Sequence, residues 1–293
     1  MADAAIDART ARGLRAKAAG IWLLPPLLLS AAVFLYPLSL IVHEALTAGG
    51  ATIQIAPALS ILQSSLFLNA LYNTLRIAIG ASAGCLVLGF VLGLVLAFVP
   101  FPGSSLAARL IETFIALPTF LIALAFTFIY GSAGVLNEGL MQLTGAALPP
   151  FDFLYTAWGV ILAEVTVYTP FVLRPLLAAF SMIDKAQLEM ASGLGARAPT
   201  IIRRVVLPAA LPAMIAGGSL CLLLTVNEFG IVLFIGAKGV VTLPLLVYSK
   251  AIQEFDYTTA CVIAVANLVL SLGLYSLYRG VVGWLGGVRA GVV

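Results

Sequence analysis

Charged residues are scarce in this chain, and their scarcity excludes an ordinary soluble domain. Only 9% of the 293 residues are charged, while 62% are hydrophobic. In a typical soluble domain about a quarter of the residues are charged. The net charge of +3 is too small to indicate a nucleic-acid partner. The sequence therefore predicts an integral membrane protein in contact with lipid.

Histidine and cysteine are also rare. His43 is the only histidine, so no cluster of histidines can hold a metal ion. Cys85, Cys221 and Cys261 lie within apolar runs and lack CxxC or Cys/His spacing, which predicts neither disulfides nor a metal site. With one histidine and scattered acids, the chain offers no catalytic constellation. We expect it not to be an enzyme.

A phosphate-binding loop is missing as well. The pattern Gly-x-x-x-x-Gly-Lys-Ser/Thr, which cradles nucleotide phosphates, occurs nowhere in the sequence. We therefore expect this chain to bind no cofactor. Any function driven by ATP would need ATP and Mg²⁺ on a separate ATPase partner.

Long apolar runs define the predicted architecture. A hydrocarbon layer about 30 Å thick needs about 20 helical residues, and six runs meet that length. They are residues 21–42, 73–99, 112–132, 157–180, 209–235 and 257–279. The predicted fold is an all-α, polytopic membrane helix bundle with six transmembrane helices over residues 21–285. Residues 1–20 and 286–293 are predicted cytoplasmic tails.

The distribution of basic residues predicts the orientation. The N-terminal tail, the connections at 100–111 and 181–208, and the C-terminal end from Arg279 onward together hold eleven Lys and Arg residues. The opposite connections hold only Lys238 and Lys250. Because cytoplasmic connections carry the excess of basic residues, both termini are predicted to be cytoplasmic. For the outer connection at 43–72, a flexible tether and an ordered segment both remain open.

One connection is unusually polar. Residues 181–208 include six charged residues among 28 positions. Asp184 and Gln187 have the spacing of a helix N-cap and its capping box. We expect a short helix through Met190 at the cytoplasmic face.

A second helix is predicted after a glycine turn. Gly193 and Gly195 can adopt the left-handed backbone conformation that ends a helix at little energetic cost. Pro199 suits the first turn of a following helix, and Pro208 is expected to bend or end that helix. The segment therefore reads as a cytoplasmic helix-turn-helix.

The same residues resemble a known family motif. In the printed sequence they are Glu189, Met190, Ala191, Gly195, Val205, Leu207 and Pro208. Their spacing is similar to that of the EAA loop, Glu-Ala-Ala…Gly…Ile-x-Leu-Pro, of type I permeases of binding-protein-dependent ABC importers. Met190 replaces the usual Ala, and Val205 the usual Ile.

This resemblance implies a function and a set of partners. In that family the loop couples the permease to a dimer of ABC ATPase subunits. A second permease subunit, homologous or identical, completes the channel, and a periplasmic solute-binding protein delivers the solute. The implied location is a bacterial inner membrane. An ordinary amphipathic hairpin is the alternative for residues 181–208.

The resemblance extends over nearly the whole chain and implies a cargo. The stretches FIALPTFLIALAFTFIYGSAG, GVILAEVTVYTPFVLRP and CLLLTVNEFGIVLFIGAKGVVTLP are similar to permeases of bacterial 2-aminoethylphosphonate importers. Related permeases for ferric iron, sulfate, molybdate or polyamines share the architecture and remain alternatives. Nothing in spacing or periodicity indicates phosphonate.

Polar residues within the spans are candidates for a translocation path. Glu164, Asn227 and Glu228 lie within or near the fourth and fifth spans. A charge at the membrane centre costs about 2.5 to 3.5 kcal/mol on insertion scales, so these side chains should face protein or water. Structural pairing is the alternative role. A secondary carrier would also use such residues, but the chain shows no strong internal repeat.

Small residues within the second span predict close helix packing. Gly80 and Gly84, and then Gly89 and Gly93, are spaced four residues apart. Such spacing lets two helix backbones approach closely. We expect packing within the bundle rather than dimerisation.

Overall fold

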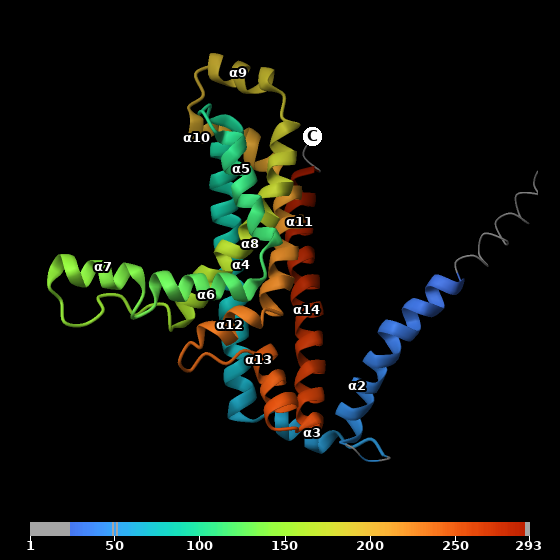
Figure 1. Ribbon diagram of the computed structural model, residues 1–293. Helices are drawn as coiled ribbons and strands as arrows, with labels where there is room; N and C mark the ends of the chain where they lie inside the picture. Colours follow the sequence, from blue (N-terminus) through green and yellow to red (C-terminus); the bar gives the residue numbers. More distant parts are fainter. Residues whose placement is uncertain (1–23, 49, 51, 291–293) are drawn as a thin grey trace, which may run out of the picture.

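The computed structural model describes residues 24–48, 50 and 52–290. In this part of the chain every regular element is helical, as Figure 1 shows. The elements are η1 Ala31–Leu35, α2 Tyr36–Thr47, α3 Ile55–Leu62, α4 Ser65–Phe98, α5 Ser104–Thr113, η2 Phe114–Ala116, α6 Thr119–Tyr130, α7 Val135–Thr144, α8 Ala157–Ser181, α9 Lys185–Gly193, α10 Ala198–Ile201, η3 Ile202–Val206, α11 Leu207–Val226, α12 Gly230–Ile235, α13 Leu243–Tyr248, η4 Ser249–Gln253 and α14 Tyr257–Ala290. The predicted tail at 1–20 lies outside the described residues.

The predicted all-α bundle with six spans is confirmed. Six helical stretches are long and apolar enough to cross a membrane, in the same order as the predicted spans. They are Leu24–Thr47, Ser65–Phe98, Thr119–Thr144, Ala157–Ser181, Ala198–Val226 and Tyr257–Gly280. Their boundaries differ from the predicted ones wherever capping or a helix break, rather than hydropathy, sets the end of a helix.

Helix α8 forms the centre of the bundle. It packs against α4 and α11, which also contact each other. Val160, Val172 and Leu176 on α8 are fully buried, as expected for a helix that is apolar on all sides. Because α8 leads into residues 181–208 and α11 leads out, this core fixes the polar segment at one end of the molecule (Figure 1).

Glycines allow the close approach of α4 to α8, as the sequence predicts. A Cβ added at Gly84 would lie 2.5 Å from Cγ2 of Val165, and one at Gly89 would lie 3.0 Å from Cγ1 of Val172. The other two glycines of the spacing also meet α8 side chains, at 3.0 Å. The prediction of packing within the bundle is confirmed.

Gly84→Ala is expected to lower the free energy of unfolding by about 1–3 kcal/mol, the usual cost of overpacking. The added methyl group would overlap Val165, whose branched side chain has one preferred rotamer in a helix. Gly80→Ala is the matched control, because its Cβ would lie 3.0 Å from Cδ1 of Ile161, the flexible end of a longer side chain. Thermal unfolding of the purified protein measures the difference. Equal melting temperatures for the two variants would contradict this interpretation.

The first span leaves the bundle. Figure 1 shows its helix running away from the other helices, and none of its most apolar 18 residues is buried. Only the end of α2, at Ala45 and Thr47, is buried, in the region where α2 contacts α14 and α3. Residues 21–23 of the predicted span lie outside the described part. An apolar helix this exposed requires a covering of lipid or of another protein.

The second span begins earlier than predicted. Its helix starts at Ser65 rather than at residue 73, because the Ser64 hydroxyl caps it by accepting a hydrogen bond from the Phe67 amide at 3.2 Å. Before it, α3 orders part of the outer connection at 43–72. An ordered segment, rather than a flexible tether, therefore occupies much of that connection.

The prediction that Pro208 bends or ends the loop's second helix is wrong about the end. The π-helical turn η3 precedes Leu207, and α11 continues through Pro208 to Val226. Pro208 therefore lies inside one continuous helical stretch, Ala198–Val226, and the π turn directly before it is a local distortion of the kind that a proline produces within a helix. The fifth span therefore starts at Ala198 and stops before the predicted residue 235.

The third stretch is divided and turns sideways. Helices α6 and α7 project from the side of the bundle in Figure 1. Buried Asn137 holds this arm together, because its amide nitrogen donates to the carbonyls of Gly131 at 2.9 Å and Phe151 at 2.7 Å. Its amide oxygen accepts from the Phe151 N–H at 2.9 Å. Three hydrogen bonds thus order an outer connection that the apolar pattern alone did not define.

Candidate functional site: a coupling loop and a helix break

The polar loop at 181–208 folds as two helices joined by a turn. Asp184 caps α9, because its Oδ1 accepts a hydrogen bond from the Ala186 amide at 2.9 Å. Pro199 lies in the first turn of α10. The predicted N-cap and the predicted helix-turn-helix are therefore present, with α9 at the far end of the molecule in Figure 1.

The turn depends on one glycine rather than two. Gly195 has φ of +84°, a conformation that side-chain-bearing residues rarely adopt. Gly193 is still part of α9, so the prediction that it belongs to the turn is wrong. No atom among the described residues lies within 4 Å of a Cβ built on Gly195. The turn is therefore open on its outer side.

The motif residues divide into an exposed set and an anchored set. Glu189, Met190 and Gly195 are exposed, and Ala191 is half-buried on the same helix as Glu189. The second set follows the turn and is half-buried where the chain joins α11. It consists of Val205, Leu207 and Pro208. The first set can contact a partner, while the second holds the loop on the bundle.

Exposed apolar side chains mark the outer face of the loop. Met182, Met190 and Leu194 are 86%, 63% and 89% exposed, although the surrounding segment is polar. Apolar side chains gathered in this way indicate a protein contact surface. The motif contains Met190 but not its two neighbours, so the resemblance alone did not identify them.

A helix break follows α11 at the other end of that helix. Glu228 is buried, and its Oε1 accepts a hydrogen bond from the Ile231 amide at 2.8 Å. Its Oε2 accepts one from the Tyr168 hydroxyl on α8. The carboxylate thus ties the start of α12 to the central helix. It has a structural partner, and that partner is a tyrosine rather than an arginine.

Asn227 lies beside Glu228 but is exposed. Its amide nitrogen donates to the Leu223 carbonyl at 2.8 Å and to Oγ of Ser271 at 3.3 Å. Its amide oxygen accepts from Asn267 at 3.0 Å. The sequence reading missed Asn267 and Ser271, although their spacing of four residues places both on one face of α14. Exposed Asn227 therefore meets half-buried Asn267 and buried Ser271 between the end of α11 and α14.

Glu164 is fully enclosed within α8. It is 0% exposed, and neither carboxylate oxygen has a hydrogen-bond partner among the described residues. Glu228 is near enough to interact with it electrostatically. Of the three candidate path residues, the structure thus places Asn227 at a surface and the two glutamates in the interior.

Two interrupted spans meet at this level. Helix α12 packs against α6, and a Cβ added at Gly230 would lie 2.9 Å from Oγ1 of Thr119 at the start of α6. Leu117 and Pro118, just before α6, are exposed. Interrupted helices of this kind place backbone polar groups beside a protein-lined or aqueous path.

The described residues contain no group of three or more His, Cys, Asp or Glu side chains that could hold a metal ion. The site therefore has two parts, an exposed surface on the loop and a polar break after α11. Neither part presents a set of groups arranged for covalent chemistry.

Comparison with known proteins points to one family. Residues 89–286 match the family described as "Binding-protein-dependent transport system inner membrane component". PhnU of Salmonella paratyphi A (strain ATCC 9150 / SARB42), named as a proposed 2-aminoethylphosphonate transport system permease protein, is 63% identical over 259 residues. That match covers 88% of this chain and 90% of PhnU.

A more distant relative and a solved structure agree. The sulfate transport system permease protein CysT of Salmonella typhimurium is 32% identical over 211 residues, covering 70% of this chain and 72% of CysT. The fold is similar to that of a bacterial ABC transporter involved in the import of the acidic polysaccharide alginate. The TM-score is 0.79 at 18% identity, covering 94% of this chain and 98% of that chain.

Proposed function

The chain belongs to the binding-protein-dependent transport system inner membrane components, and on that basis we propose that its cargo is 2-aminoethylphosphonate. It is a multi-pass inner-membrane permease component of an ABC importer. The observation that carries the proposed cargo is the 63% identity to PhnU over most of both chains.

The chemistry of the helix break is compatible with this cargo. 2-Aminoethylphosphonate carries an ammonium and a phosphonate, so its path must tolerate both signs of charge. Exposed Asn227, with half-buried Asn267 and buried Ser271 beside it, offers neutral donors and acceptors. Conduction requires binding weak enough for release. We therefore assign Asn227 to the path, with Glu228 and Glu164 as deeper candidates that a conformational change would have to uncover.

The exposed surfaces support a second permease subunit. The first span lacks neighbours along most of its length, and the amide of Asn227 lies on a surface that lipid would cover only at a cost. A second permease, homologous or identical, would cover both and enclose the path.

The remaining partners follow from what the loop presents. Glu189, Met190 and Gly195 would dock on an ATPase subunit, which supplies ATP hydrolysis because this chain lacks a phosphate loop. The permease itself is then non-catalytic and binds no cofactor. With the loop in the cytoplasm, both termini are cytoplasmic, and a periplasmic binding protein delivers the cargo from the opposite side.

Uptake by cells lacking the gene tests the proposed cargo. Complementation with the intact chain should restore accumulation of labelled 2-aminoethylphosphonate. Excess unlabelled 2-aminoethylphosphonate should compete, and excess sulfate should not. Sulfate is the informative competitor because a sulfate permease is 32% identical to this chain. Restored sulfate uptake without 2-aminoethylphosphonate uptake would reject the cargo while leaving the permease assignment intact.

A further inference from the structure

We propose that the apolar cavity between the coupling loop and the end of α4 binds one acyl chain of an anionic phospholipid. This site is separate from the path and from the outer docking face of the loop. It assigns a second ligand to the loop, bound from within the membrane.

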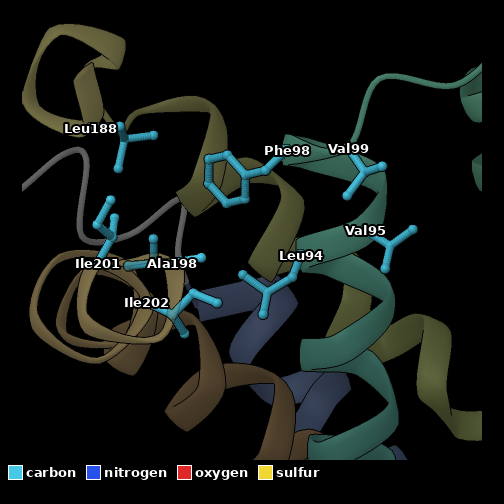
Figure 2. Close-up of a pocket in the computed structure, with 9 residues that line it drawn as sticks. Leu94, Val95, Phe98, Val99, Leu188, Ala198, Ile201 and Ile202 are labelled. Atoms are coloured by element: carbon cyan, nitrogen blue, oxygen red, sulfur yellow. The ribbon is translucent and has the colours of Figure 1, made fainter. Parts of the chain in front are cut away.

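The cavity has a volume of about 350 Å³, and three segments form its walls. Leu94 and Phe98 come from α4, Leu188 from α9, and Ile202 and Val206 from η3. Figure 2 shows side chains from α4, α9 and the α10–η3 helix around a common space. Every lining residue is Ala, Val, Leu, Ile or Phe. Because apolar cavities exclude water, the expected occupant is hydrocarbon.

The position of the cavity makes lipid the accessible hydrocarbon. Two walls belong to apolar stretches long enough to span a membrane: one is the C-terminal end of Ser65–Phe98, and the other is the N-terminal end of Ala198–Val226. Val95 and Val99 on the α4 wall are 39% and 51% exposed. The cavity therefore lies at the edge of the hydrocarbon layer, where an acyl chain can enter from the side.

Charge on the loop favours an anionic headgroup. A second cavity of about 500 Å³ adjoins the first, shares Phe98, Val99 and Leu188 with it, and is also lined by Lys185 and Glu189. The loop carries four basic and two acidic residues, a net charge of 4 − 2 = +2. Basic residues beside a membrane attract anionic lipid. An acyl chain in the first cavity would place its headgroup in this adjoining cavity, beside Lys185.

A lipid bound in the cavity would affect how the loop couples to the ATPase. Leu188 belongs to α9, which also carries Glu189, and Ile202 lies just beyond α10. An acyl chain packed against both would hold the loop at a fixed position relative to α4. Without the acyl chain, the loop would lose apolar contacts on its inner side. The dispersion energy of each contact is small, but the sum over all of them is large.

Photocrosslinking identifies the occupant directly. The complete transporter, with a diazirine analogue of leucine, close to leucine in size, in place of Leu94, is reconstituted in nanodiscs of phosphatidylcholine mixed with phosphatidylglycerol. We expect an adduct with the mass of phosphatidylglycerol. A peptide adduct, from residues 1–23, a second copy or another subunit, would overturn the proposal. Equal labelling of the two lipids would overturn the preference for an anionic headgroup.

Two variants and a control test the residues. Each basic residue near a membrane gives about a fivefold gain in affinity for anionic lipid, so Lys185→Gln, which removes the basic side chain that lines the adjoining cavity, should retain about fivefold less phosphatidylglycerol in native mass spectrometry. Ala198→Phe should abolish retention by filling the cavity while leaving the charges intact. Arg109→Gln, on exposed α5, should change nothing. Unchanged retention in both test variants would overturn the proposal, whatever the cargo is.

Discussion

Gly195→Val is expected to reduce uptake about 5- to 30-fold while the permease reaches its normal level in the membrane. Gly195 has φ of +84°, and a left-handed conformation costs about 1–2 kcal/mol for a residue with a Cβ. A free-energy cost of about 1–2 kcal/mol lowers the ratio of correctly folded to distorted turn about 5- to 30-fold. Because nothing in the described chain lies near the added side chain, the bundle itself should fold normally. Uptake and ATPase co-purification, measured on the same membranes, test this result.

Gly193→Val is the matched control for that experiment. Gly193 is helical and also has open space around it, but its φ is not positive. The same side chain two residues away should therefore leave coupling nearly unchanged. Equal loss of uptake in the two variants would show that any larger side chain on the loop is harmful. It would contradict the specific role of the positive φ at Gly195.

Glu228→Leu is expected to lower the amount of folded permease severely. The substitution leaves the Ile231 amide and the Tyr168 hydroxyl without their partner, and both residues are buried. Each unsatisfied buried group costs about 1–3 kcal/mol. The two groups together cost about 2–6 kcal/mol, a large part of the total stability of about 5–15 kcal/mol that is typical of a domain. Quantifying the assembled complex by detergent extraction and immunoblotting measures the loss.

Glu228→Gln separates structure from transport. Glutamine keeps the shape and can still accept from the Ile231 amide, so the complex should assemble in near-normal amounts. If Glu228 also lines the path, uptake per assembled complex should fall. If its role is structural alone, uptake per complex should stay unchanged. Tyr168→Phe, which removes only the hydroxyl, should reproduce part of the assembly defect. Normal assembly of Glu228→Leu would reject the structural role.

Hydropathy predicted the number and order of the spans because that number depends only on long apolar runs. It missed boundaries set by single polar contacts, such as the cap at Ser64 and the break after Val226. The position of Pro208 misled because proline is read as a helix breaker. Here the helix continues through the proline, with a π turn directly before it.

The coupling loop was predictable in outline because its capping, turn and motif residues are close in sequence. What the sequence could not supply were contacts between distant segments. Asn267 meets Asn227 across 40 residues, and Tyr168 meets Glu228 across 60. The cavity under the loop likewise requires α4 and η3, which only the folded bundle brings together.

The most direct test of the account is uptake by proteoliposomes that contain the permease, its ATPase and the binding protein, with ATP sealed inside. The account predicts accumulation of labelled 2-aminoethylphosphonate only when all three components and ATP are present, and its loss in Gly195→Val. Accumulation without the ATPase, driven by an ion gradient alone, would contradict it.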